Sequence, residues 1–243
     1  MKQNKIIEVF NNGKLIQYKQ RVAFHEAGHA AGIYLNNKAR QLPPVFFKII
    51  FKDMGGMTGT EGMAYQTIHG DCIARVKGGR LIEWLPAPID SLGVGLTEHN
   101  DAIVRLVNDY MLACEADIIN LLIGPLAEAK HVAHTDDELF NHQLINLEAL
   151  ENYGGSYDIA LANEYLQSFS VDKQQKDKKL AELFTVAFDF INNDANWAAI
   201  TQLADYILGS NENIIYCEEI ASTLDQAVAH FQNRRSNVRH HHG

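Results

Sequence analysis

Two histidines and a glutamate near the start of the chain stand at the spacing of a metal site, in the run His25-Glu26-Ala27-Gly28-His29. Side chains at positions i and i+4 of a helix lie on one face, so the two imidazoles can bind the same ion. Glu26 lies beside them and can take a proton from a water molecule that the ion acidifies. The pattern is HExxH, and it predicts a Zn²⁺ site with His25 and His29 as ligands and Glu26 as general base.

The same run has a simpler interpretation, in which a packed helix carries two histidines that make hydrogen bonds in the core. Gly28 favours the metal site, because glycine in the middle of a helix costs about 1 kcal/mol relative to alanine. We therefore expect another backbone, or the metal site itself, to approach Gly28 closely. A catalytic zinc normally has three protein ligands, so a third must come from elsewhere in the chain.

The elements around the motif are predicted from hydrophobic spacing and from breaks. Residues 19–35 lack proline, are rich in alanine and have helical periodicity. The apolar run at 45–51 is typical of a strand, and 63–68 and 81–85 are weaker candidates for its partners. Residues 101–133 are predicted to be helical, with a kink or an interruption at Pro125.

The second half of the chain is predicted to be helical. We expect helices at 156–169, 180–192, 197–208 and 218–231, with a charged break at 172–179. The predicted fold class is therefore α+β and mostly α, with the HExxH helix packed on a small β-sheet and a C-terminal helical bundle. We expect one domain: an N-terminal extension (1–20), a catalytic core (21–170), C-terminal helices (171–232) and a tail (233–243) that ends in a tag-like histidine run.

Composition and charge exclude several classes of function. With 243 residues and 47% hydrophobic residues the chain can bury a large core. Its formal net charge of −9 argues against nucleic acid as a partner. We expect no membrane span, because no run approaches about 18 uninterrupted apolar residues. The three cysteines lack CxxC pairing, which favours reduced thiols and, with no signal peptide expected, a cytoplasmic location.

Three segments together resemble the peptidase domain of the FtsH-type proteases, which are membrane-anchored ATP-dependent zinc metallopeptidases. Residues 23–30, Ala-Phe-His-Glu-Ala-Gly-His-Ala, closely resemble the signature of that family. Residues 121–128, Leu-Leu-Ile-Gly-Pro-Leu-Ala-Glu, are similar to its Leu-x-Gly-Arg-x-Ala-Glu helix. Residues 154–160, Gly-Gly-Ser-Tyr-Asp-Ile-Ala, are similar to its Gly-Ala-x-Asn-Asp-Leu segment. The resemblance spans about residues 21 to 230 and is strongest at the HEAGH motif.

The resemblance implies roles for two further residues. The aspartate of the family's third segment is a zinc ligand, and it corresponds to Asp158. The glutamate of its second segment supports the zinc-binding histidines, and it corresponds to Glu128. From the residues alone, Asp158 is also explained as an acid in the first turn of a helix, favoured by the helix dipole. Glu128 as the third ligand in place of Asp158 is the fallback.

Departures from the family limit what the resemblance implies. The sequence has no GxxxxGK[ST] loop and no membrane anchor, and Pro125 replaces the arginine of the family. We therefore expect a standalone domain that does not unfold its substrates, with a homo-oligomer or a separate ATPase left open as partners. In the family an edge strand holds the substrate in extended form, and its expected equivalent is 62–67, which is also explained as an ordinary strand of the sheet.

A second group of side chains that can bind metals begins in the last turn of the helix predicted at 101–133 and continues beyond it. Its spacing is irregular and it lies in a polar segment, so a solvated surface explains it better than a second metal. The group consists of His131, His134, Asp136, Asp137, Glu138 and His142.

The function that these observations predict is ATP-independent zinc-dependent hydrolysis of peptide bonds in peptides or unfolded proteins. Glu26 would deprotonate the attacking water and pass the proton to the leaving amine. Two alternatives stay open. One is a non-catalytic zinc-binding module with an interaction or regulatory role, and the other is a zinc hydrolase acting on a small amide.

Overall fold

The computed structural model describes residues 2–51, 74–84, 101–167 and 172–240, and side chains are described for 13–51, 74–83, 104–167 and 172–236. The described chain is mostly helical with a small three-stranded antiparallel sheet, which confirms the α+β, mostly α fold class. The helices are α1 Lys2–Ala31, α2 Asn37–Ala39, α3 Asp101–Thr135, α4 Ser156–Gln167, α5 Lys173–Asn192, α6 Asp194–Gly209 and α7 Cys217–His240. The strands are β1 Phe47–Phe51, β2 Ala74–Gly78 and β3 Ile214–Tyr216.

Three shorter helical segments complete the described chain. A π-helix, Gly32–Asn36, joins α1 to α2, and 3-10 helices occupy Leu81–Trp84 and Ala149–Tyr153. The sheet has the order β2-β1-β3, with Ile49 of β1 opposite Val76 on one side and Ile215 on the other. The strand predicted at 45–51 is therefore confirmed as the central strand of the sheet.

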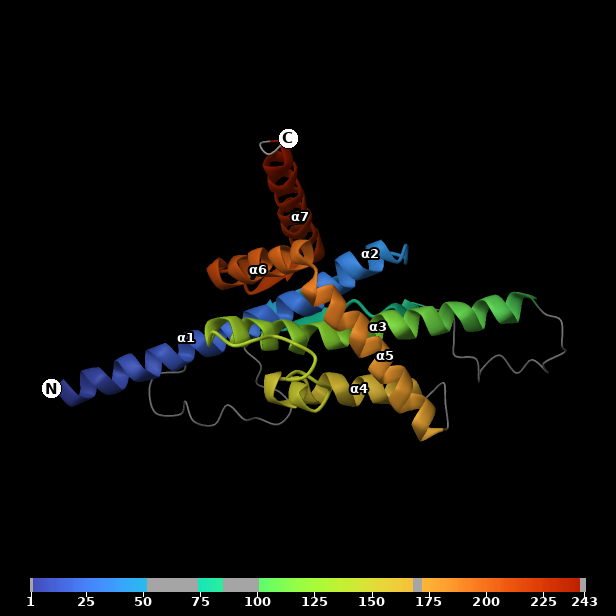
Figure 1. Cartoon of the computed structure of the whole chain (residues 1–243), viewed down its shortest axis with the longest axis horizontal. Helices are drawn as coiled ribbons and strands as arrows, with labels where there is room; N and C mark the ends of the chain where they lie inside the picture. The colour runs from blue at the N-terminus through green and yellow to red at the C-terminus, as the bar shows by residue number, and fades with distance from the viewer. Residues whose placement is uncertain (1, 52–73, 85–100, 168–171, 241–243) are drawn as a thin grey trace.

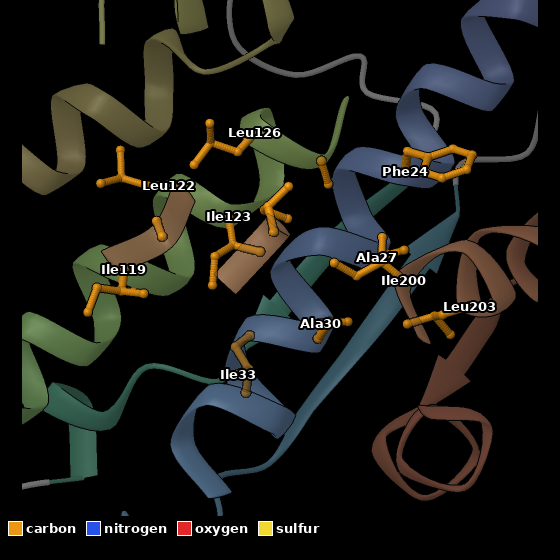
Figure 2. Close-up of a cluster of buried hydrophobic side chains, with 14 of the residues drawn as sticks. Phe24, Ala27, Ala30, Ile33, Ile119, Leu122, Ile123, Leu126, Ile200 and Leu203 are labelled. Carbon is orange, nitrogen blue, oxygen red and sulfur yellow. The ribbon is translucent and has the colours of Figure 1, made fainter. Parts of the chain in front are cut away.

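Helices α1 and α3 form the centre of the molecule and run antiparallel to each other, with their first turns projecting in opposite directions (Figure 1). Figure 2 shows α1 between α3 on one side and α6 on the other. Ala27 and Ala30 are fully buried, and these small side chains allow the neighbouring helices to approach closely. Larger apolar side chains fill the space on both sides, among them Ile119, Leu122, Ile123, Leu126, Ile200 and Leu203.

The predictions for individual elements have mixed outcomes. The strand expected at 81–85 is wrong, because Leu81–Trp84 is a 3-10 helix whose first N–H groups, at Leu81 and Ile82, donate to the buried Asp117 carboxylate. The charged break expected at 172–179 is also wrong. Asp172 caps α5 by accepting a hydrogen bond from Gln174 N, so the charged residues form the first turns of that helix.

Helix α3 continues through Pro125, so the alternative of an interruption at that residue is wrong. By length and composition Val104–Thr135 could cross a membrane, but 78% of its most apolar window is buried inside the protein. A buried core helix meets the same criteria, so this feature does not by itself indicate a membrane. The strand expected at 63–68, the substrate-binding strand expected at 62–67 and Cys72 lie outside the described residues.

Candidate metal centre

Helix α1 carries the HExxH residues into the interior at its contact with α3. A Cβ atom on Gly28 would lie 2.7 Å from Ala127 Cβ and 2.8 Å from Ile123 O. Only glycine therefore fits at this helix crossing, and the close backbone approach predicted for Gly28 is observed. This contact holds the last two turns of α1, and with them His25 and His29, against α3.

Three side chains that can hold a metal ion converge at this crossing. They are His25, His29 and Asp158, whose ligand atoms all lie within 4.8 Å of one another. The Nε2 atoms of the two histidines are 3.0 Å apart. Asp158 Oδ2 lies 3.4 Å from His25 Nε2, and Asp158 Oδ1 lies 3.5 Å from His29 Nε2. The structure thus brings together two residues from α1 and one from α4, which is far away in the sequence.

The imidazole of His25 is oriented by an anion. Glu128 Oε2 lies 3.0 Å from His25 Nδ1, while Glu128 Oε1 accepts a 2.8 Å hydrogen bond from Arg21 Nε. Arg21 also donates to Asn152 O at 3.0 Å, which ties this pair to the 3-10 helix before α4. Because Nδ1 is engaged by the carboxylate, Nε2 is the nitrogen that faces Asp158. Glu128, for which the resemblance implies a supporting role, thus lies against His25 and is not one of the three residues grouped as possible metal ligands.

The imidazole of His29 is oriented by a neutral group. His29 Nδ1 lies 3.0 Å from the backbone oxygen of Asn120. A carbonyl oxygen only accepts hydrogen bonds, so Nδ1 carries the proton and the Nε2 lone pair is free. A Cβ atom on Gly124 would lie 2.4 Å from Nε2 and Cε1 of His29, so the ring packs directly on the glycine backbone of α3.

Asp158 reaches the site because of the turn before α4. Gly154 has φ of 73°, a left-handed conformation that ends the 3-10 helix Ala149–Tyr153. A Cβ atom on Gly154 would also lie 3.1 Å from His25 Cε1. The chain therefore turns tightly beside His25, and α4 starts at Ser156 with Asp158 in its first turn and buried. The helix dipole favours an acid there, and the position beside the two histidines leaves Asp158 available as a ligand, so the two explanations are compatible.

Glu26 lies in the same buried region but is bound to the sheet. Its Oε2 atom accepts a 2.5 Å hydrogen bond from Val76 N of β2, and the residue is only 6% exposed. Burial raises the pKa of Glu26 to about 7, against the lowering effects of the His25 charge and the Val76 N–H. A carboxyl group with such a pKa can both accept and release a proton near neutral pH.

The two histidines differ in their affinity for protons. Burial opposes protonation of His25, but the carboxylates of Asp158 and Glu128 outweigh it and raise the pKa of His25 well above its usual value. Burial, together with the His25 charge, lowers the pKa of His29 in spite of Asp158. In the metal-free protein a protonated His25 can therefore donate its Nε2 proton to the free lone pair of His29.

The second histidine group lies against aromatic rings. His131 stacks on Phe24 with ring centroids 3.9 Å apart, and His142 lies 3.6 Å from the Phe188 ring. His134 makes an edge contact with Trp197. Asp136, Asp137 and Glu138 are exposed. Within the described residues, the His25, His29 and Asp158 group is the one arrangement found that can hold a metal ion.

Apart from Glu128, which the resemblance singled out, sequence reasoning did not find the residues that orient the two histidines. Arg21 is four residues before His25 on the same helix, which is a usable signal once Glu128 is placed beside that histidine. The role of Val76 N, and that of the Asn120 carbonyl, depend on backbone groups, which leave no signal in the sequence. No family model, no curated protein and no solved structure matches this chain. Its function must therefore be argued from the site.

Proposed function

We propose that this chain is a zinc-dependent peptidase, resembling a standalone FtsH-type peptidase domain, which hydrolyses peptide bonds of unfolded proteins or peptides. One observation carries the proposal: two imidazoles and a carboxylate each bring a possible ligand atom to one place, and these atoms lie within 4.8 Å of one another. Ligands of a tetrahedral zinc ion at about 2.0–2.2 Å are about 3.3–3.5 Å apart. Here Asp158 Oδ2 lies 3.4 Å from His25 Nε2 and Asp158 Oδ1 lies 3.5 Å from His29 Nε2, while the two Nε2 atoms are closer together, at 3.0 Å.

The chemistry of the donor set also suits zinc. Two neutral imidazoles and one carboxylate form a mixed nitrogen and oxygen set of three protein ligands, which is typical of catalytic rather than structural zinc sites. Each ring is oriented through its Nδ1 atom, by Glu128 for His25 and by the Asn120 carbonyl for His29. Such support fixes the tautomer that presents Nε2 to the metal.

His25, His29 and Asp158 would hold the zinc, which would supply Lewis acidity that polarises a carbonyl group and acidifies the attacking water. Glu26 is the residue that takes the proton from this water and delivers it to the leaving amine. Its pKa of about 7 suits both steps. We propose further that the HExxH helix packs on the sheet, which the Val76–Glu26 hydrogen bond supports because it ties Glu26 to β2.

A second candidate is a non-catalytic zinc-binding module. The observation that favours it is the same hydrogen bond, since a Glu26 carboxylate held by Val76 N has one oxygen fewer for proton transfer. In this case the ion stabilises the fold, and the chain acts through a partner.

Hydrolysis of casein by the zinc-loaded protein separates the two candidates. We expect cleavage that a chelator stops, and we expect Glu26→Gln to abolish it while zinc stays bound at one equivalent. Glu182→Gln is the matched control, because Glu182 is an exposed glutamate of α5 remote in sequence from the site. If wild type binds zinc but is as inert as Glu26→Gln, the binding module is the correct interpretation. If wild type binds no zinc at all, both candidates fail.

A further inference from the structure

Three buried asparagines form a hydrogen-bonded group next to His29, and the backbone of one of them, Asn120, contacts that histidine. Asn36, Asn37 and Asn120 are 6%, 3% and 5% exposed. Asn36 Nδ2 donates to Asn120 Oδ1 at 2.9 Å, and Asn120 Nδ2 donates to Asn37 Oδ1 at 3.0 Å. The Asn120 side chain is thus held on both sides, by two consecutive residues of which Asn36 ends the π-helix and Asn37 starts α2. We call these three residues the amide cluster.

The backbone around the amide cluster is unusual. Asn36 is the last residue of the π-helix Gly32–Asn36, and Asn37 is the first residue of α2. A Cβ atom on Gly32 would lie 3.1 Å from Asn120 Oδ1 and 3.2 Å from Asn120 Cα, so this segment approaches α3 closely at Asn120. Single π-helical turns cost helix stability and are frequent at functional sites. Here the extra residue of the wide turn places two neighbouring amides against one side chain.

The amide cluster is not arranged for stability alone. Burying an amide is unfavourable unless its hydrogen bonds are satisfied. Within the described part of the chain, Asn37 Nδ2 is the one buried side-chain nitrogen or oxygen atom that has no hydrogen-bond partner. Apolar side chains of similar size would avoid this cost. This cost points to a second role for the amide cluster.

The backbone of Asn120 provides that role. Its carbonyl oxygen accepts the hydrogen bond from His29 Nδ1. We propose that Asn120, held in place by Asn36 and Asn37, is a positioning residue that fixes the tautomer and the ring orientation of His29. The inference rests on the proposed metal site for its purpose, but the positioning itself is a property of the metal-free protein. His25 is held by an anion, and His29 by a carbonyl that the amide cluster anchors.

Asn120→Ala tests this inference, because it removes both amide hydrogen bonds and keeps the backbone carbonyl that His29 uses. Asn36→Ala removes one of the two hydrogen bonds and serves where the first variant does not fold. Asn196→Ala is the matched control, since Asn196 Nδ2 also donates to a partly buried backbone carbonyl, that of Phe190, and the residue belongs to a different helix, α6. Asn120→Asp is the rescue variant. It offers one acceptor to Asn36 and, after rotation of the Asn37 amide, another to its unpartnered Nδ2.

The first measurement is the imidazole ¹⁵N spectrum of His29 in the metal-free protein. We expect one tautomer in wild type, with the proton on Nδ1, and a mixture of tautomers in Asn120→Ala and Asn36→Ala. We expect Asn196→Ala to resemble wild type and Asn120→Asp to recover most of the Nδ1–H form. The second measurement is zinc affinity, which should fall about tenfold in the two alanine variants that disrupt the cluster.

The outcomes separate the inference from the proposed function. A folded Asn120→Ala or Asn36→Ala protein with an unchanged His29 tautomer overturns the positioning role. The positioning role is also overturned if Asn196→Ala changes the tautomer as much as Asn120→Ala. If the tautomer responds as expected while wild type binds no zinc, the positioning role stands and the proposed function fails.

Discussion

Gly124 offers the sharpest test of where His29 must lie. Alanine at this position would place Cβ 2.4 Å from Nε2 and Cε1 of His29, about 1 Å short of ordinary contact. The α3 backbone is buried against α1 and cannot move by this amount, so the imidazole must move. Because Nε2 is the atom proposed to bind zinc, the displacement acts directly on the ligand.

The size of the effect follows from this overlap. Overpacking of a core costs about 1–3 kcal/mol, and the gain in helix propensity from glycine to alanine offsets about 1 kcal/mol of it. The net loss of stability is therefore small, about 0–2 kcal/mol. A misplaced ligand should weaken zinc binding much more, by about 10- to 100-fold, as the loss of an outer-shell partner does. Gly124→Ala should separate metal affinity from folding.

The assay compares Gly124→Ala with Gly13→Ala, using competition with a chromophoric chelator for zinc affinity and urea titration for stability. Gly13 is a helical glycine of α1, and a Cβ atom added there would have nothing within 4 Å. Gly13→Ala therefore measures only the gain in helix propensity from glycine to alanine. Our reasoning is refuted if folded Gly124→Ala binds zinc as tightly as Gly13→Ala does.

Three further predictions concern the supports of the site and the effect of pH. Glu128→Gln should weaken zinc binding by about 10- to 100-fold, because the His25 imidazole loses its anionic partner. If Glu128→Gln and wild type had equal zinc affinity in the same chelator competition, this prediction would be wrong. Protons compete with zinc for His25, so zinc affinity should rise by up to about tenfold per pH unit until the pH exceeds the raised pKa of His25. A zinc affinity that does not change with pH around neutrality would exclude His25 as a ligand. Burial raises the pKa of Asp117 to about 6, above its value of about 3.9 in the unfolded chain. The folded protein therefore binds this proton more tightly than the unfolded chain does. The free energy of unfolding should fall by about 3 kcal/mol as the pH rises through these two pKa values. Urea titrations at pH 4 and pH 7 should show this loss in wild type and not in Asp117→Asn, and equal pH dependence in the two proteins would show that Asp117 is not its source.

Local patterns in the sequence were sufficient for the long elements. The apolar run at 45–51 indicates a strand wherever it packs, because β-branched and aromatic side chains favour extended backbone. Helix α6 was predicted within three residues at each end, since Asn193 caps it and an apolar stripe follows. The i and i+4 spacing also brings His25 and His29 together in any helix. These features depend on neighbours in the chain.

Tertiary contacts decided what local patterns could not. The segment Leu81–Trp84 forms a 3-10 helix because Asp117, a residue of another element, accepts hydrogen bonds from its first N–H groups. Strand β3 is three residues between two helices, too short to show a period of its own.

The same division holds at the candidate metal centre. The sequence by itself determined the histidine pair and, through resemblance, singled out Asp158 and Glu128. The tertiary structure decided that Asp158 lies 3.4 Å from His25 Nε2 and that a backbone carbonyl holds His29. Helix periodicity relates residues within about one turn, whereas Asp158 reaches the histidines only because α1 and α3 cross at Gly28 and the chain turns at Gly154. Those approaches are set by packing of distant segments, which no local pattern records.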